Sequence, residues 1–215
     1  MCGLCSVIVD GALTSACLLP AVLVDWSSIA TIRIRNQATI GGNLAHADPS
    51  QDPPPLLMAL DAAIEIAGPA GARRVVPMAD FFVDFFETVL EPGEVILGVR
   101  VPTAEAGART VYRKFMPRSA DDYATVSVAS TLRLDPDGRV AAARIALGGV
   151  GPRPVRARAV EEALVGELPG DARLRDAAEL VRDAIDPLDD VRGSARYKRD
   201  MAAVWVRRAV AEAVA

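Results

Sequence analysis

The second half of the chain alternates apolar and polar residues over three consecutive segments, and this alternation constrains the fold most. "TVYRKFM", "ATVSVASTLRL" and "RVAAARIALG" have the two-residue period of half-buried strands. The last two are joined by "DPDG", a composition typical of a hairpin turn. Three segments of helical character follow: "PVRARAVEEALVG", "DARLRDAAELVRDAI" and "SARYKRDMAAVWVRRAVAEAVA". The pattern predicts an α+β fold, in which an antiparallel three-stranded sheet packs with a C-terminal helical bundle.

The segment before residue 104 mixes helix and strand signals. "PLLMALDAAIEIA" begins as a helix and ends as a strand, "RRVVPM" and "EVILGVRVP" are β-branched runs, and "EPGE" is a turn. "ADFFVDFFETVL" has apolar pairs at helical spacing, so its four phenylalanines are predicted to lie in the core. The last helix is predicted to have an amphipathic stripe, formed by Tyr197, Met201, Val204 and Trp205. A domain boundary is predicted at "PTAEAGA", residues 102–108.

Composition excludes several classes of protein. The 215 residues are 51% apolar and 24% charged, which is typical of a globular protein. A net charge of −4 with interspersed signs argues against a nucleic-acid partner. No apolar run reaches the roughly 18 residues of a membrane span, and no basic segment precedes the first apolar stretch, so we expect a cytoplasmic protein without a signal peptide. His46 is the only histidine, which excludes a Ser-His-Asp triad elsewhere in the chain.

The three cysteines lie together in "CGLCSVIVDGALTSAC", residues 2–17. They are either small buried thiols or metal ligands on a loop, because a cytosolic setting disfavours disulfides. "CSVIVDGAL" predicts a strand, a turn at Asp10-Gly11 and a return strand. The spacing resembles the last three ligands of the [2Fe–2S] loop in the small subunit of molybdenum hydroxylases. With three ligands of four, we expect no [2Fe–2S] cluster and no protein-bound metal.

A second motif begins at Thr39, "TIGGNLAHADPSQDPP". Gly41 and Gly42 can adopt positive φ and let main-chain N–H groups approach an anion. Asp52 before Pro53 is a good N-cap for the helix that follows. The full string "R-N-x-x-T-I-G-G-N-L-A-H-A-D-P-x-x-D-x-P" resembles the FAD-binding motif of the medium subunit of molybdenum hydroxylases, the family of xanthine dehydrogenase and aerobic carbon monoxide dehydrogenase. The resemblance covers roughly residues 22–215.

The resemblance implies a set of FAD-binding residues. Thr39, Ile40, Gly41, Gly42 and Asn43 are expected to wrap the diphosphate, and Asp52 to accept a hydrogen bond from the flavin. Ile96 is expected to pack near the cofactor, and Lys114 to reach the isoalloxazine edge, where a cation stabilises negative charge on the reduced ring. Without the resemblance, Asp52 is a helix cap, Ile96 a core residue and Lys114 a solvated strand residue. No residue is assigned a catalytic role.

The resemblance also implies the function and its partners. The chain is expected to be the FAD-dependent oxidoreductase subunit of a molybdenum hydroxylase, relaying electrons from iron–sulfur clusters through FAD to a terminal acceptor. A large molybdenum-binding subunit, which alone carries the molybdenum cofactor, and a small [2Fe–2S] subunit are the expected partners.

The expected domains are a [2Fe–2S]-loop fragment (1–21), a partial FAD-binding domain (22–103) and the C-terminal medium-subunit domain (104–215). The family's first FAD-binding lobe, with its second glycine-rich loop, has no counterpart in this sequence, so FAD binding is expected to be weak or lost. The alternative is a truncated, non-catalytic remnant that retains only a subunit-docking domain.

Overall fold

The C-terminal part of the chain forms a four-stranded antiparallel sheet. The computed structural model describes residues 6–9, 12–15, 37–118 and 123–215. The sheet has the order β11-β10-β9-β8 and is formed by β8 (Arg109–Phe115), β9 (Val126–Leu134), β10 (Val140–Gly148) and β11 (Val155–Arg156). The predicted "DPDG" hairpin is confirmed, because the Gly138 amide bonds to the Asp135 carbonyl between β9 and β10. The sequence predicted three strands and missed β11, which is only two residues long.

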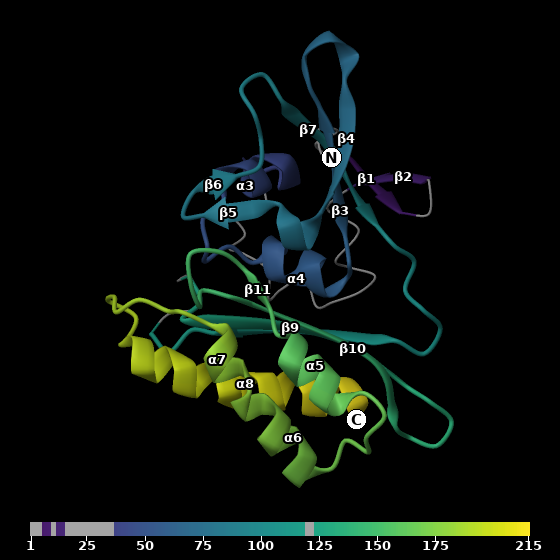
Figure 1. Cartoon of the computed structure of the whole chain (residues 1–215), viewed down its shortest axis with the longest axis vertical. Helices are drawn as coiled ribbons and strands as arrows, with labels where there is room; N and C mark the ends of the chain where they lie inside the picture. Colours follow the sequence, from purple (N-terminus) through teal and green to yellow (C-terminus); the bar gives the residue numbers. More distant parts are fainter. Residues whose placement is uncertain (1–5, 10–11, 16–36, 119–122) are drawn as a thin grey trace.

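Four helices cover one face of this sheet (Figure 1). They are α5 (Arg158–Leu164), α6 (Asp171–Glu179), α7 (Val181–Ala184) and α8 (Ala195–Val214). The second predicted helix is divided at Leu180 into α6 and α7. Large apolar residues of every second strand position, including Val128, Ile145 and Leu147, pack against the helices and form the first core.

The predicted stripe on α8 is not the face that is buried. Met201, Val204 and Trp205 are half-buried, and Tyr197 is exposed. The residues of α8 in the core are mainly small, and they are Ala202, Ala203, Val206, Ala209, Val210 and Ala213. Alanine lets the helix approach the sheet closely, whereas the large residues lie at its margin, where Trp205 stacks on Phe115 with ring centroids 5.4 Å apart.

The opposite face of the C-terminal sheet is lined by small residues and contacts the N-terminal part. Ala129, Ala146 and Gly148 lie at neighbouring positions of β9 and β10 on this face. Helix α4 (Pro53–Ala59) packs there, above β9 and β10 in Figure 1. The second core joins α4 and Ala129 to the strands of the N-terminal part. The chain is therefore layered as helices, sheet, α4 and a second sheet.

The N-terminal part is built on a five-stranded sheet of order β2-β1-β7-β3-β4. Its strands are β1 (Ser6–Val9), β2 (Ala12–Ser15), β3 (Ala63–Ala67), β4 (Arg73–Pro77) and β7 (Val95–Val101). The predicted hairpin in the cysteine segment is present as β1 and β2, and β1 pairs in parallel with β7. The remaining elements are α3 (Ile40–His46), the short helices η2 (Pro69–Gly71) and η3 (Met78–Asp80), and the hairpin of β5 (Phe82–Asp84) with β6 (Glu87–Thr88).

The prediction for "ADFFVDFFETVL" is wrong. This segment forms η3 and the β5–β6 hairpin, with Phe86 at positive φ in the turn. Phe81 and Phe82 lie in the core, but Phe85 and Phe86 are 42% and 58% exposed. The helical spacing of the phenylalanines is a coincidence, because Phe85 and Phe86 form the exposed turn between β5 and β6. In the described ranges, no helix has both the length and the apolar content to cross a bilayer.

Candidate functional site

The glycine motif forms the start of a helix and not a left-handed turn. Helix α3 begins at Ile40, and the Thr39 side chain caps it by accepting a hydrogen bond from the Gly42 amide at 3.0 Å. Gly41 and Gly42 have helical φ, which corrects the prediction that they adopt positive φ. The first amides of a helix have no intrahelical partner and are oriented toward its N-terminal end, where a negative group is favoured. The anion-binding role of Thr39–Asn43 stays a prediction, and its structural basis would be the first amides of a helix instead of a left-handed turn.

Steric space explains why glycines occupy these two positions. A Cβ on Gly42 would lie 2.9 Å from Thr39 Oγ1, so any larger residue displaces the capping hydroxyl. A Cβ on Gly41 would lie 3.8 Å from Ile96, an ordinary contact distance. Ile96 on β7 is therefore next to the loop, and the structure brings together this part of the predicted site.

Asp52 and Lys114 form a second group, buried between α4 and β8. Lys114 Nζ lies 3.1 Å from Asp52 Oδ2, and the two side chains are 8% and 4% exposed. Asp52 occupies the N-cap position of α4 but makes no side-chain capping bond, so its predicted role as a helix cap is wrong. Lys114 is not a solvated strand residue either. The structure thus joins two predicted site residues that are 62 positions apart in the sequence.

Sequence reasoning missed Tyr112. Its hydroxyl donates a hydrogen bond to Asp52 Oδ1 at 2.7 Å in a buried environment. Burial raises the pKa of Tyr112 well above its usual value, the negative charge of Asp52 and the bond to it act in the same direction, and Ser127 opposes them. The signal was available, because Tyr112 lies two residues before Lys114 in an alternating strand and therefore shares its face.

Tyr123 also lies near this group. Burial and the nearby charges of Asp48 and Asp52 raise the pKa of Tyr123, while Arg192 lowers it. The Arg192 guanidinium lies over the Tyr123 ring, 5.3 Å from its centroid. The position of Tyr123 beside these charges could not be predicted from the sequence, because Arg192 and Asp48 are far from it along the chain.

Two buried amide oxygens lack a hydrogen-bond partner within the described ranges. They are Asn43 Oδ1 in the glycine motif and Gln51 Oε1 beside Asp52. Buried acceptors without a partner are uncommon in native proteins, so each is suited to a ligand that carries hydroxyl or N–H groups. The residues present therefore fit FAD, with helix-terminal amides for a diphosphate and acceptors for ribityl and ring donors.

A metal centre is not formed by the part of the chain that the structure describes. No group of three or more His, Cys, Asp or Glu side chains is placed to hold an ion there. Cys2, Cys5 and Cys17 lie outside the described residues, so the expectation of no [2Fe–2S] cluster stays a prediction.

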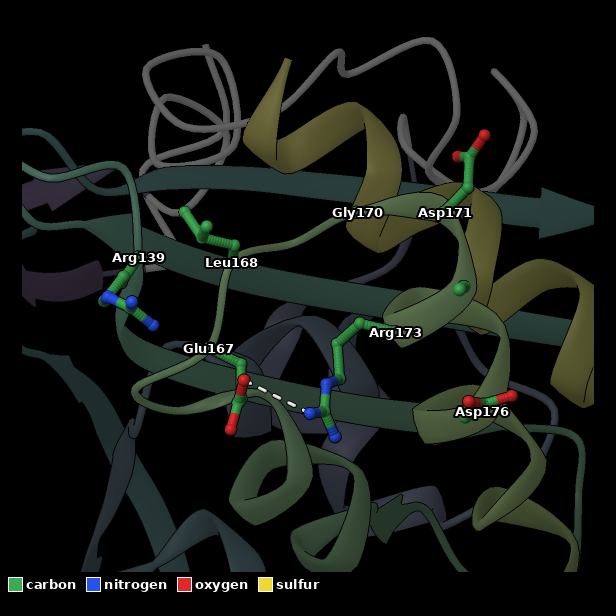
Figure 2. Close-up of a pocket in the computed structure, with 8 residues that line it drawn as sticks. Arg139, Glu167, Leu168, Gly170, Asp171, Arg173 and Asp176 are labelled. Atoms are coloured by element: carbon green, nitrogen blue, oxygen red, sulfur yellow. Dashed lines mark ion pairs between the residues drawn. The ribbon is translucent and has the colours of Figure 1, made fainter.

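A separate open pocket lies where the β9–β10 hairpin approaches the start of α6, as Figure 2 shows. Its charges are mixed, with Arg173 paired to Glu167 at 3.2 Å. It contains none of the predicted site residues, and it is lined by Arg139, Glu167, Leu168, Gly170, Asp171, Ala172, Arg173 and Asp176.

Comparison with known proteins agrees with this arrangement. Residues 5–104 match the FAD binding domain in molybdopterin dehydrogenase, and residues 111–213 match the CO dehydrogenase flavoprotein C-terminal domain. The chain is 37% identical over 200 residues to the carbon monoxide dehydrogenase medium chain of Afipia carboxidovorans, covering 93% of this chain and 68% of that one. It is 37% identical over 185 residues to the glyceraldehyde dehydrogenase medium chain of Sulfolobus acidocaldarius, covering 86% and 64%.

Solved structures give the same result. Carbon monoxide dehydrogenase from Hydrogenophaga pseudoflava superposes with a TM-score of 0.82 at 40% identity, over 86% of this chain and 63% of that chain. Quinoline 2-oxidoreductase from Pseudomonas putida 86 gives a TM-score of 0.80 at 34% identity, over 87% and 64%. The chain thus spans about two thirds of the length of these relatives. It belongs to the FAD-binding medium subunits of the molybdenum hydroxylase family, the family of the carbon monoxide and xanthine dehydrogenases.

Proposed function

We propose that the chain binds FAD at the Thr39–Asn43 loop and acts as the flavin subunit of a molybdenum hydroxylase. The observation that carries this proposal is the start of α3, where the first helix amides, two glycines without side chains and the Asn43 oxygen, which has no partner among the described residues, lie together beside Ile96. These groups match the two chemical parts of FAD, an anionic diphosphate and a polar ribityl chain. The membership of the family supports the same assignment.

The residues of the site have distinct proposed roles. Thr39, Ile40, Gly41, Gly42 and Asn43 hold the diphosphate with main-chain and side-chain groups. Ile96 forms an apolar wall next to the loop. Asp52 and Lys114 provide a buried acceptor and a cation for the polar edge of the ring, and Lys114 favours its reduced form. The loop and Ile96 lie before the proposed boundary near residue 104 and Lys114 lies after it, and the two family matches divide in the same region.

The proposed function is electron transfer through FAD in a complex with two partner subunits. Bound FAD would supply the ability to accept single electrons and to discharge two. A small [2Fe–2S] subunit is the proposed donor, and a large subunit with the molybdenum cofactor is the proposed site of hydroxylation. The relatives are named as medium chains or subunits of dehydrogenase complexes, which supports this organisation. A cytoplasmic location remains part of the proposal.

We also propose that FAD affinity of this chain is weak. The sequence contains one glycine-rich loop, Thr39–Asn43, where the family resemblance implies two around the diphosphate. Charge-assisted hydrogen bonds contribute about 1.5–3 kcal/mol each, so several missing ones lower the affinity by orders of magnitude. A tight complex of FAD with the wild-type chain would contradict this part of the proposal and leave the site assignment intact.

A matched pair of glycine substitutions tests the site. Gly41→Ala adds a Cβ at ordinary contact distance from Ile96, so the free protein should unfold at an unchanged temperature. The same methyl group occupies space that the diphosphate needs, so FAD binding, measured by quenching of flavin fluorescence, should weaken at least tenfold. Gly170→Ala is the control, because its Cβ meets no atom within 4 Å and its φ is negative. Equal FAD affinity of the wild type and Gly41→Ala would show that the loop is not the site.

A further inference from the structure

The β5–β6 hairpin places three large apolar side chains at the surface within four consecutive residues. Val83, Phe85 and Phe86 are 48%, 42% and 58% exposed, whereas Phe81 and Phe82 at the base of the hairpin are buried. Single exposed apolar residues are common on protein surfaces, but a group of large ones is typical of a binding surface. We call Val83, Phe85 and Phe86 the hairpin tip.

The hairpin tip is held in one conformation. Phe86 has a positive φ of 55°, which is strained for a bulky side chain. Its amide donates a hydrogen bond to the Ala47 carbonyl at 3.2 Å, and its ring centroid lies 5.3 Å from that of His46. The Phe85 amide donates to Asp84 Oδ1 at 2.8 Å. The chain thus keeps an apolar surface exposed and ordered, and an ordered surface loses less entropy on binding.

Carboxylates surround the hairpin tip. Between residues 75 and 99 the sequence has five acidic residues and no lysine, arginine or histidine. Asp84 and Glu87 lie opposite each other in the hairpin, and Asp80 lies in η3, which contacts β5. All three are exposed, and none of them pairs with a lysine or arginine of the described ranges. A complementary surface therefore has an apolar centre edged by positive charge.

The position and the charge of the hairpin tip restrict what binds there. The hairpin lies beside α3, the helix that begins at the proposed diphosphate site (Figure 1). Electron transfer requires the donor to come close to the flavin, and the small [2Fe–2S] subunit is the proposed donor. A second copy of this chain would bring like charges together in a symmetric contact, and an anionic membrane would be repelled.

We propose that the hairpin tip is a docking surface for the small [2Fe–2S] subunit, which binds it through an apolar pocket edged by lysine or arginine. The inference rests on the proposed function, because it takes this subunit to be the electron donor to FAD. It gives Phe85 and Phe86 a role at the surface, where the sequence pattern predicted core residues.

The substitution Phe86→Asn separates docking from stability. Asparagine adopts positive φ readily, so the free chain should unfold at an unchanged or higher temperature. The affinity of the full chain for the purified small subunit, measured by isothermal titration calorimetry, should fall about tenfold or more, because aromatic anchors dominate interfaces. Leu168→Asn is the matched control, because Leu168 is 54% exposed in the open pocket of Figure 2, where the charges are mixed. This control should leave the affinity unchanged.

A charge reversal tests the second part of the inference. The affinity of the wild type should fall between low salt and 1 M salt, where the Debye length is about 3 Å. Glu87→Lys should weaken binding at low salt and reduce this salt dependence, because a positive charge then faces the basic edge of the pocket. Glu162→Lys, an equal change at an exposed position of α5, should leave both quantities unchanged.

The possible results separate this inference from the proposed function, because FAD binding is measured independently by flavin fluorescence. If the wild type binds FAD, and Phe86→Asn and Glu87→Lys bind the small subunit as the wild type does, the inference fails alone. It is also overturned if the wild type does not bind the small subunit, if the large subunit binds at the tip instead, or if sedimentation shows a dimer of the free chain that Phe86→Asn dissociates. If the wild type does not bind FAD, the proposed function fails, while a loss of small-subunit binding in both variants still supports the docking surface.

Discussion

Asp61 joins the N-terminal part to the C-terminal sheet through two arginines, and replacing it should destabilise the protein measurably. Asp61 follows α4, and its carboxylate accepts hydrogen bonds from Arg144 on β10 and Arg156 on β11. These arginines extend the contact to Glu105 at 3.0 Å and to Glu161 at 2.5 Å. Arg133 completes a balanced network of three arginines and three carboxylates.

The expected magnitude follows from the exposure of the network. The Asp61 side chain is 44% exposed, so its two ion pairs are screened more than buried ones. Exposed pairs contribute about 0.2–1 kcal/mol, whereas breaking a buried pair costs about 3–5 kcal/mol. Arg144 and Arg156 are more buried than Asp61, which places the loss for Asp61→Asn at about 1–2 kcal/mol. For a chain of this length, each kcal/mol lowers the unfolding temperature by about 2–4 °C.

The choice of substitution separates charge from backbone strain. Asp61 has a positive φ of 52°, a conformation that asparagine tolerates at least as well as aspartate. Asp61→Asn therefore removes the charge and keeps the backbone preference, whereas Asp61→Ala changes both. Thermal unfolding followed by circular dichroism should show the loss at low salt and a smaller one at 1 M salt, where the Debye length is about 3 Å. An unchanged Asp61→Asn beside a destabilised Asp61→Ala would refute the electrostatic reasoning and assign the effect to the backbone.

Three other predictions concern stability. Arg74 binds both oxygens of Glu94 and, with the Glu91 amide, lowers the pKa of Glu94 to about 2. The ion pair therefore stabilises the folded state fully above the usual pKa of 4.5, and this stabilisation is lost as the pH falls toward 2. The difference in unfolding temperature between the wild type and Glu94→Gln should shrink across this window. Ser194→Ala removes the cap of α8, whose hydroxyl accepts from the Tyr197 amide, and should cost about 1 kcal/mol in denaturant unfolding. A fragment of residues 104–215 should unfold cooperatively in calorimetry, because the first core contains only residues from 111 onward; a gradual transition would contradict this.

The elements that the sequence predicted correctly are those in which local pattern and burial agree. The alternation in β9 and β10 puts large residues such as Val128 and Ile145 toward the helices, and the "DPDG" turn fixes the register between the two strands. The switch from α4 to β3 was also readable, because helix formers give way to the β-branched "AIEIA". In these segments the hydrophobic pattern keeps one period, that of a helix or that of a strand, over enough residues to exclude the other.

The incorrect predictions have a common physical cause. Where the local sequence pattern fits two structures, tertiary contacts determine which of them forms. The phenylalanine pairs of residues 81–86 have a spacing that fits a helix or a hairpin, and packing selected the hairpin. On α8, the hydrophobic pattern predicted a buried stripe that included Trp205. The close contact of the helix with the sheet instead buries alanines such as Ala202 and Ala209. Alternation could place Tyr112 on the same strand face as Lys114, but it could not give the contact of Tyr112 with Asp52, because these two residues are 60 positions apart.

Helix α4 explains how residues from both parts of the chain meet at the candidate site. It lies on the small-residue face of the C-terminal sheet, and a carboxylate at each end binds that sheet. At the beginning, Asp52 contacts Tyr112 and Lys114 in a buried position, and just past the end Asp61 contacts two arginines at the surface. A rigid helix held at both ends cannot shift or rotate on the sheet without breaking one set of bonds. The contacts of Asp52 and the contacts of Asp61 therefore jointly set the position of Lys114 relative to the Thr39–Asn43 loop. The contacts of Asp52 belong to the proposed flavin site, whereas those of Asp61 do not. This division predicts that substitutions at Asp61 change stability with little effect on FAD affinity, and that substitutions at Tyr112 change both.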